Sequence, residues 1–592
     1  MGGKASCASK VDGLEVAKVA EFNKTTRMKE VILANGKSIL VVKTDSGFYA
    51  VGSKCTHYGA PLIDGNVYNG HIRCPWHGAC FNLANGDIEQ FPGLDSLQSY
   101  PCKVKSGTVF AYHTSEPAEP VLRPMCKMSK RSHVIVIIGT GISAVMCAQT
   151  LRQEQYDGRI ILITKDKQFP YDRTKLSKVP GIKWNEIKLR DPDFFHSYDI
   201  EIMLDSPVSK VRFPDRTVVV DNGKDTTLVY DKLLIASGLR PRSYGPVIPG
   251  GDLKNIVTLY NMEDASQIAS QAAGKDVLIC GSSFIAMELA TSLKSKAKHV
   301  NIIGRSRSPY GIVLGPATGK AILNHLLEGP DGNKVRYWGI DEVKSFEGNA
   351  KKEVVKVLTM KKKAFDAQLV ILAIGAIPNT DFLEDTPIRL NQQDGAVCVN
   401  KFLETSVKDV YAAGDVTQFP TEFSAKGRAS ICHCGIATHH GKVAAQNMMG
   451  KEMTVHQIVP FFWTVVAGVN VRYAGYGEGH SDTAIFGSLE SMEFCTLYRR
   501  SNRALGIATV NCDPLAAQMA DEFQAGIKYK HDYPITVLKR FPKPPVVGEK
   551  YFGFKEDIAE FATYDLRNAP AKKPTDTDNL RKKSRSVVNL ND

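Results

Sequence analysis

The stretch VIVIIGTGISA, residues 134–144, decides the fold class. Its first five residues form a continuous apolar run, which is typical of a strand buried in a parallel sheet. Gly139 and Gly141 follow where a helix would begin, and Ala144 takes the third place of the same pattern. Glycines at these places permit a tight turn and let a pyrophosphate approach the helix N-terminus. The stretch therefore predicts a Rossmann-type dinucleotide-binding unit.

The next strand of this unit is expected at residues 159–164, which are again apolar. An acidic residue near the end of this strand usually binds the adenosine ribose. Asp166 is therefore a candidate ribose ligand, although it is imperfectly placed for that role.

A second copy of the pattern begins in DVLICGSSFIAME, residues 276–288. Gly281 keeps the first glycine place, but Ser283 takes the second and would bring a side chain toward the pyrophosphate, which weakens binding. The following strand, residues 300–304, ends at Arg305 without a carboxylate. A cation there can meet a 2′-phosphate, so NADPH is as plausible as NADH, with a solvated arginine as the alternative.

Three more apolar strands end in glycine where the chain would leave a sheet. They are residues 233–238, residues 369–375 with Gly375 at the end, and a strand that runs into Gly414 and Asp415. Strands that alternate with helical patterns favour parallel sheets. We therefore expect two Rossmann-like domains.

The N-terminal part differs, because residues from about 14 to 115 alternate apolar and polar side chains between turns. This pattern predicts an all-β module. It carries Cys55-Thr-His57 and Cys74-Pro-Trp-His77, with sixteen residues between His57 and Cys74. Two thiols and two imidazoles can bind zinc, or they can hold a Rieske [2Fe–2S] cluster with two cysteines on one iron and two histidines on the other.

The order of these ligands favours the cluster. Zinc fingers usually group cysteine with cysteine and histidine with histidine, whereas each cysteine here has its own histidine, which resembles the Rieske motif. Zinc is the alternative. The extra cysteines that brace high-potential Rieske loops are replaced by Ala60 and Trp76. We therefore expect a potential in the lower part of the roughly −150 to +300 mV Rieske range.

Together these motifs resemble the two-dinucleotide flavoprotein reductases, and more closely the apoptosis-inducing-factor-like proteins with an N-terminal Rieske domain. The resemblance covers nearly the whole chain to about residue 540. Residues 169–177, with Arg173, look like the flavin-contact segment, and Asp415 matches the carboxylate that holds the ribityl chain of FAD. Residues 473–478 are similar to a stretch of the C-terminal domain.

The resemblance implies a multidomain α/β protein with an all-β module, in which the nicotinamide domain is inserted between two halves of the FAD domain. The expected units are a flexible N-terminus (1–13), a Rieske [2Fe–2S] domain (14–115), a linker (116–131), an FAD-binding domain (132–261 and 386–455), an NAD(P)-binding domain (262–385), a C-terminal α+β reductase domain (456–550) and a disordered basic tail (565–592).

The resemblance also implies site residues. Lys175 and Glu288 should pair near the flavin edge and serve as catalytic residues, because hydride transfer depends on positioning. Amides at the helix start near His433 would face the pyrimidine end of the flavin, and Trp463 would cover its ring or lie in the core. The expected cofactor-binding residues are Gly139, Gly141, Ala144, Asp166, Arg173, Lys175, Gly281, Ser283, Glu288, Arg305, Gly375, Asp415, His433 and Trp463, and the expected iron ligands are Cys55, His57, Cys74 and His77.

Composition excludes several other classes of protein. The chain has 592 residues, 43% hydrophobic and 23% charged, which is ordinary globular usage. Its longest apolar runs are far shorter than the roughly 18 residues of a membrane-spanning helix. A net charge of +13 is modest for this length, and we expect no nucleic-acid partner. Thirteen cysteines without dense spacing argue against a secreted disulfide scaffold and predict an intracellular protein.

Residues 1–6 fit the Met-Gly-x-x-x-Ser pattern that is N-myristoylated on Gly2. One myristoyl chain binds membranes only marginally, so Cys7 acylation or nearby lysines would have to assist. The pattern predicts the cytosol or a cytoplasmic membrane face, with an unmodified N-terminus as the alternative, whereas the family resemblance implies mitochondria. A homodimer is left open.

The expected function is that of an FAD-dependent oxidoreductase, which passes electrons from NAD(P)H through FAD to a Rieske cluster. His57 and His77, if they are partly exposed as in other Rieske proteins, would be the exit toward an unknown acceptor. The alternative is a redox-sensing, apoptosis-related factor with little steady turnover.

Overall fold

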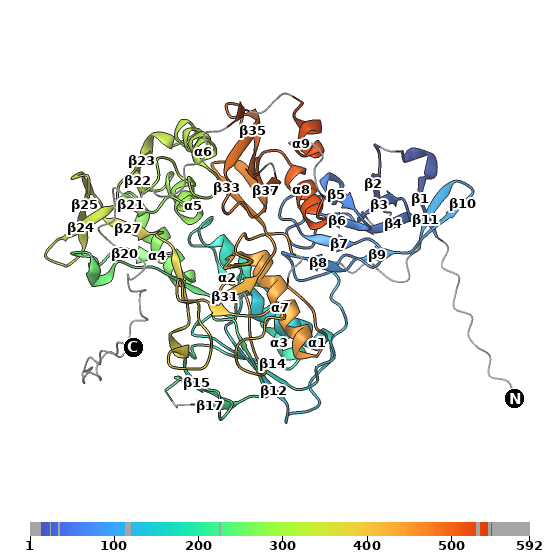
Figure 1. Cartoon of the computed structure of the whole chain (residues 1–592), viewed down its shortest axis with the longest axis horizontal. Coiled ribbons are helices and arrows are strands. Elements are labelled where there is room, and N and C mark those ends of the chain that lie inside the picture. Colours follow the sequence, from blue (N-terminus) through green and yellow to red (C-terminus); the bar gives the residue numbers. More distant parts are fainter. Residues whose placement is uncertain are drawn as a thin grey trace.

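The computed structural model describes residues 13–23, 25–33, 36–112, 120–223, 226–455, 458–501, 503–527, 533–542 and 546–547. The N-myristoylation pattern and the basic tail lie outside these residues, so both stay predictions. Figure 1 shows the N-terminal module beside the C-terminal domain and the helices of the FAD domain, with the nicotinamide domain on the far side. Within the described part of the chain, no helix is long and apolar enough to cross a membrane.

The N-terminal module is built from three antiparallel sheets, as its alternating sequence predicts. Alternate residues of the central strand β3 face different cores: Leu40 and Val42 pack in one, Ile39 and Val41 in the other. The strands are β1 (Leu14–Lys18), β11 (Thr108–Ala111) and β10 (Cys102–Lys105); β2 (Met28–Ile32), β3 (Ser38–Thr44), β4 (Gly47–Gly52) and β9 (Ser99–Tyr100); and β5 (Asn66–Tyr68), β6 (His71–Arg73), β7 (Cys80–Asn82) and β8 (Ile88–Gln90), with short 3₁₀ turns at Val19–Glu21 and Leu62–Asp64.

The FAD-domain sheet is parallel, with the strand order β14-β13-β12-β18-β30. Because β30 follows the nicotinamide domain in sequence, the chain leaves this sheet after β18 and returns to it. Gly441 lets the helices α1 (Ile142–Gln153) and α7 (Cys434–Met448) approach each other, since a Cβ there would lie 2.2 Å from the Ser143 carbonyl oxygen. The elements are β12 (Val134–Ile138), α1 (Ile142–Gln153), β13 (Arg159–Ile163), η3 (Arg173–Lys175), α2 (Trp184–Ile187), α3 (Pro192–Ser197), β14 (Ile200–Met203), β15 (Val208–Arg212), β16 (Thr217–Val220), β17 (Thr226–Val229), β18 (Lys232–Ile235), β19 (Leu239–Pro241), η4 (Gly245–Val247), η6 (Asp381–Leu383), β29 (Val397–Cys398), β30 (Val410–Ala412), β31 (Thr417–Pro420), β32 (Arg428–Ala429) and α7 (Cys434–Met448).

The nicotinamide-domain sheet is also parallel, with the order β20-β27-β21-β22-β23. A short antiparallel pair, β19 with β28, joins it to the FAD domain. Its elements are β20 (Ile256–Thr258), α4 (Met262–Ala272), β21 (Asp276–Cys280), α5 (Phe284–Leu293), β22 (His299–Gly304), α6 (Pro316–Glu328), η5 (Gly332–Lys334), β23 (Val335–Gly339), β24 (Val343–Gly348), β25 (Val354–Thr359), β26 (Ala364–Asp366), β27 (Leu369–Leu372) and β28 (Ala376–Pro378).

The C-terminal domain is an antiparallel sheet with helices against it, with the strand order β33-β34-β37-β36-β35-β38. The predicted fold class, an all-β module followed by two Rossmann-like domains and an α+β domain, is therefore confirmed. The elements are β33 (Phe461–Val466), β34 (Val469–Gly475), β35 (Asp482–Ser488), β36 (Glu493–Arg500), β37 (Arg503–Val510), α8 (Leu515–Gln524), α9 (Ile535–Arg540) and β38 (Val546–Val547).

The segment expected to be a linker is bound to both of its neighbours in the part that is described, from residue 120 on. Val121 and Ser96 exchange two backbone hydrogen bonds, of 2.9 and 3.0 Å, and the Cys126 amide donates to the Arg152 carbonyl at 3.0 Å. This part of the proline-rich segment is therefore an extended strap that is hydrogen-bonded to its neighbours. Its hydrogen bonds are made by the main chain, so the sequence shows no apolar pattern that would reveal them.

Candidate functional site

A cavity of about 1750 Å³ lies where the FAD domain, the nicotinamide domain, the C-terminal domain and the N-terminal module meet. Gly139, Gly141 and Asp415 line it from the FAD domain, Ser283 lines it from the nicotinamide domain, and His57 reaches it from the first cluster loop. The two dinucleotide patterns and the Cys-His pattern therefore converge on one cavity.

The FAD side of this cavity has the groups that a dinucleotide needs. Gly139 has φ +118°, and a Cβ there would lie 2.2 Å from the Ala236 carbonyl oxygen, so only glycine fits the turn. Around Gly141 the space is open, and this residue caps α1 without a side-chain hydrogen bond. Exposed amides at the start of a helix bind phosphate, so the turn fits the FAD pyrophosphate.

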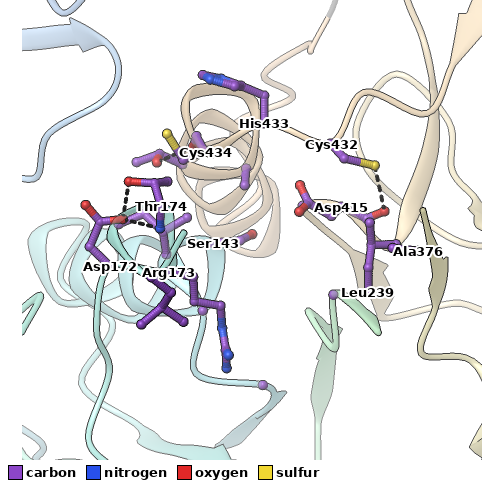
Figure 2. Close-up of a pocket in the computed structure, with 18 of the residues that line it drawn as sticks. Ser143, Asp172, Arg173, Thr174, Leu239, Ala376, Asp415, Cys432, His433 and Cys434 are labelled. Carbon is purple, nitrogen blue, oxygen red and sulfur yellow. Dashed lines mark hydrogen bonds between the residues drawn. The ribbon is translucent and has the colours of Figure 1, made fainter. Parts of the chain in front are cut away.

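Two buried side-chain oxygens at the same place lack a partner within the described ranges, Ser143 Oγ and Asp415 Oδ1. Burial raises the pKa of the Asp415 carboxyl to about 6. Buried polar atoms are normally hydrogen-bonded, so these two fit groups that accept bonds from a bound ligand or donate to it. Figure 2 shows Asp415 beside Cys432, which precedes the start of α7 and whose sulfur lies 4.0 Å from the Asp415 carbonyl oxygen.

Asp166 also reaches the cavity, but its carboxylate accepts a hydrogen bond from Arg173. Arg173 in turn lies over the Tyr171 and Tyr260 rings, at 4.9 and 5.0 Å from their centroids, and donates to the Tyr260 carbonyl oxygen at 2.8 Å. In the structure, the expected flavin-contact arginine therefore holds the expected ribose ligand in place.

Glu288 is buried on α5 and joins three parts of the chain. It accepts hydrogen bonds from Thr464 Oγ1 at 2.6 Å and from Ser177, and its ion-pair partner is Lys178, at 2.9 Å. The expected pairing of Glu288 with Lys175 is wrong. The turn after η3 carries Lys178 toward α5, and Lys175 instead lies 3.8 Å from the centroid of the Tyr58 ring.

The start of α7 forms another wall of the cavity. His433 caps this helix, since its Nδ1 accepts a hydrogen bond from the Gly435 amide at 3.2 Å, and burial lowers the pKa of His433 to about 3. Figure 2 shows Cys432 and Cys434 pointing to opposite sides of the helix start, and both thiols are free. This arrangement offers helix amides to the flavin and no thiol pair.

Arg305 is not brought to the cavity. Its side chain is 62% exposed and lies 3.5 Å from Glu342, so the prediction that it lines the bound nucleotide is not supported by contacts with this cavity. Ala144 and Gly281 contribute to the two turns through packing. Ala144 is buried in the core, and a Cβ on Gly281 would lie 2.1 Å from the Ala373 carbonyl oxygen. Gly375 does line the cavity.

The two cluster loops share one backbone pattern. In each loop the cysteine amide donates to the carbonyl five residues later, at 2.9 Å for Cys55 and 2.8 Å for Cys74. The glycine four residues after the cysteine donates back to it, at 2.8 Å from Gly59 and 3.2 Å from Gly78, and both glycines have positive φ. The loops thus present their ligands to one another as a pair.

The four expected iron ligands meet as two pairs. Cys55 and Cys74 are both buried in the same core cluster, and Nδ1 of His57 lies 3.1 Å from Nδ1 of His77. Burial lowers the pKa of both histidines, that of His57 to about 4, so both rings are neutral ligands at pH 7. Among the described residues, no three thiols, imidazoles or carboxylates converge on a point where one metal ion could sit. Two pairs fit a two-iron cluster better than one zinc ion.

The histidine pair faces the reductase. His57 lines the cavity, the His77 ring lies 4.3 Å from Trp463, and Trp463 lies 5.0 Å from His433, measured between ring centroids. The docked module turns the two histidines toward the reductase, and their expected role as the exit for electrons stays a prediction. Trp463 stands between the cluster ligands and the α7 wall of the cavity.

Polar contacts hold the N-terminal module in this position. Tyr58 donates to Asp172 at 2.6 Å, and Asp95 forms a two-bond ion pair with Arg190, at 2.6 and 2.8 Å. A second, fully buried ion pair joins Arg73 of β6 to Asp521 of α8, with Nε and Oδ1 2.7 Å apart; its side chains are 2% and 7% exposed. Buried ion pairs of this kind tolerate little displacement.

Several of these residues had no signal in the sequence. Lys178 stands in the same short segment as Lys175, and spacing alone cannot say which of the two turns toward α5. Thr464, Arg73 and Asp521 belong to no motif, since their partners lie far away in the chain. Only the arrangement of the domains reveals them.

Comparison with known proteins agrees with this geometry. The family model described as pyridine nucleotide-disulphide oxidoreductase matches residues 133–441, and the Rieske [2Fe-2S] domain model matches residues 13–101. Apoptosis-inducing factor 3 of Mus musculus is 36% identical over 512 residues, which are 84% of this chain and 82% of the mouse protein. The chain belongs to the apoptosis-inducing factor 3 family.

Membership of the apoptosis-inducing factor 3 family, with both domain models matched, makes the chain an NAD(P)H-dependent flavoprotein oxidoreductase with a Rieske iron–sulfur centre. Its cofactors are FAD, NAD(P)H and the [2Fe–2S] cluster, and the zinc alternative is excluded.

Bacterial reductases are similar over the flavoprotein part of the chain. The biphenyl dioxygenase system ferredoxin–NAD(+) reductase component of Paraburkholderia xenovorans (strain LB400) is 30% identical over 63% of this chain and 89% of its own. The solved covalent putidaredoxin reductase–putidaredoxin complex matches with a TM-score of 0.62 at 24% identity, over 67% of this chain and 94% of that one. This structural match shows the shared fold.

Proposed function

We propose that the chain passes electrons from NAD(P)H through FAD to its own Rieske cluster and from there to an external acceptor. One observation carries the proposal: the expected cluster ligand His57 lines the same cavity that fits the flavin, and the other expected ligand, His77, is in ring contact with Trp463, which also lines it. When bound, FAD takes two electrons from the nicotinamide as hydride and the cluster takes up single electrons. A chain that holds both groups can divide one two-electron event into two single steps.

The side chains around the cavity have separate roles in this proposal. Asp415 and the helix amides of α1 and α7 bind and orient the flavin. The Lys178–Glu288 pair joins the nicotinamide domain to the FAD domain and so fixes the angle at which the nicotinamide enters. Tyr58 and the Arg73–Asp521 pair keep the cluster loops against the cavity.

The proposal is tested by adding NADH or NADPH to the purified chain without oxygen. Flavin absorbance should bleach first, and a rhombic Rieske signal should then grow in the electron paramagnetic resonance spectrum. Cys74→Ser is the matched control: it should bleach the flavin at the normal rate but give no rhombic signal, because one iron loses a ligand. A flavin that bleaches while the wild-type cluster stays oxidised contradicts the proposal.

The external acceptor would receive single electrons from the cluster. The relatives named as ferredoxin–NAD(+) reductases support a one-electron protein acceptor, so repeated NADH oxidation with cytochrome c as a one-electron probe is expected. Stoichiometric reduction without turnover would favour the redox-sensing alternative. Acylation of Gly2 and a mitochondrial or membrane location stay predictions, which mass spectrometry of the N-terminus and cell fractionation would check.

A further inference from the structure

Arg472 places a positive charge inside the interface between the cluster loops and the C-terminal domain. It stands on β34 directly opposite Trp463 of β33. Residues directly opposite in an antiparallel pair point to the same face of the sheet, and Trp463 is in ring contact with His77. The Arg472 side chain, 4% exposed, therefore lies on the face that the cluster loops cover.

This guanidinium has only weak partners. Its hydrogen bonds to the Val471 carbonyl oxygen, to Asn470 and to Asp513 are all 3.4 Å long. Within the part of the chain that the structure describes, Arg472 Nε and Asp513 Oδ1 are buried and make no hydrogen bond. The charge is therefore only partly neutralised by protein groups.

The other buried cation at this interface differs in this respect. Arg73 donates to Asp521 at 2.7 Å, to the Gly78 carbonyl oxygen at 3.0 Å and to Gln90 at 2.8 Å. A buried charge is costly unless something compensates it. Arg73 is compensated by a carboxylate oxygen at 2.7 Å, whereas the carboxylate partner of Arg472, Asp513, lies 3.4 Å away.

Reduction of a Rieske cluster adds one electron, and hence one negative charge, to a unit already held by two thiolates. A fixed cation in a buried, low-dielectric place attracts the more negative form more strongly. We propose that the positive charge of Arg472 raises the reduction potential of the docked cluster, so that the cluster accepts electrons from the reduced flavin. The inference rests on the proposed function, since it takes the flavin as the electron source.

The test is a redox titration of the full-length chain with FAD and cluster bound. Electron paramagnetic resonance reports the reduced cluster, and absorbance reports the flavin in the same sample. The variants are Arg472→Gln, which removes the charge, Arg472→Lys, which keeps it, and Asp513→Asn, which removes the carboxylate nearest to it. Arg499→Gln is a control in the same sheet, because Arg499 pairs with Asp482 rather than with a cluster loop.

Arg472→Gln should lower the reduced fraction of the cluster about tenfold at a fixed potential, which is a shift of about 59 mV downward for one electron. Arg472→Lys should shift it much less. Asp513→Asn should shift it upward, because less of the positive charge is then neutralised. The flavin potential should stay in place in all variants, and Arg499→Gln should leave the cluster potential unchanged.

A purely structural role for Arg472 predicts a different pattern. If Arg472→Gln leaves the cluster potential unchanged, or if it and Asp513→Asn move the potential in the same direction, the inference is overturned. Either result leaves the proposed function standing, because the wild-type cluster is still reduced by NAD(P)H. A wild-type chain without a rhombic signal contradicts both. Should Arg472→Gln fail to fold, the inference is still tested by Asp513→Asn, which should raise the cluster potential, beside Arg472→Lys, which should leave it nearly unchanged.

Discussion

At the scale of single residues, Asp415 couples flavin binding to stability. Burial raises the pKa of its carboxyl to about 6, above the value of about 4 in an unfolded chain. The folded, flavin-free chain therefore binds the proton more tightly, and its stability falls as pH rises from about 4 to about 6. Asp415→Asn should abolish this fall.

The measurement is the urea midpoint of the flavin-free chain at pH 5 and pH 7, for wild type and Asp415→Asn. At pH 7 the variant should be the more stable of the two. It should nevertheless release FAD more readily, because the carboxylate expected to bind the ribityl chain is gone. An equal pH dependence in both chains would show that Asp415 is not the titrating group.

A second residue-scale prediction concerns Lys178. Lys178→Met leaves Glu288 buried without its ion-pair partner and loosens the junction of the nicotinamide and FAD domains. We expect flavin reduction by NAD(P)H to slow roughly 10- to 100-fold, the usual effect of a small misplacement. Lys175→Met removes the same charge without touching Glu288, and it should slow the reaction less. Stopped-flow absorbance of the flavin measures both; equal losses would contradict the assignment.

These residues also show which parts of the site the sequence can predict. The sequence could name four candidate iron ligands, because their spacing within two short loops is a local property. Asp415 could be named as a candidate because it directly follows the end of an apolar strand. Which of Lys175 and Lys178 pairs with Glu288 depends on how one turn packs against a helix that is distant in sequence, since Ser177 and Glu288 are 111 residues apart. Whether Arg305 reaches the bound nucleotide depends on the shape of the cavity, which the sequence does not show.

At the scale of elements, the buried Arg73–Asp521 pair joins β6 to α8. Asp521→Ala leaves a buried guanidinium without its carboxylate, which should cost about 3–5 kcal/mol of stability. It should also slow cluster reduction while the flavin is still reduced at its normal rate, since the pair holds only the Rieske module. Chemical denaturation and rapid-freeze electron paramagnetic resonance measure the two effects.

The control replaces both partners at once. Arg73→Met with Asp521→Leu removes both charges and keeps apolar volume, so most of the lost stability should return. If the double variant is as unstable as Asp521→Ala, the ion pair is not the source of the loss.

The elements themselves were largely predictable, because apolar runs and alternating patterns depend on neighbours in sequence. The strand expected at residues 134–138 is β12, and residues 276–280 form β21. The strap after residue 120 was not predictable, because its hydrogen bonds are made by the main chain and leave no side-chain pattern.

At the scale of the whole molecule, the order of the modules could be predicted but not how they face one another. The sequence predicted partly exposed histidines, but it could not show that His57 lines the flavin cavity or that His57 and His77 both lie beside Trp463. In the proposed function the docked cluster is the internal acceptor of the flavin, so electron transfer between them should be a property of one chain.

The most direct test is the rate of cluster reduction after rapid mixing with NADH, followed by freeze-quench electron paramagnetic resonance across about a tenfold range of protein concentration. Transfer within one chain predicts a first-order rate constant that does not change with concentration. A rate that rises in proportion to concentration would mean that the electrons pass between molecules, and it would contradict the docked arrangement.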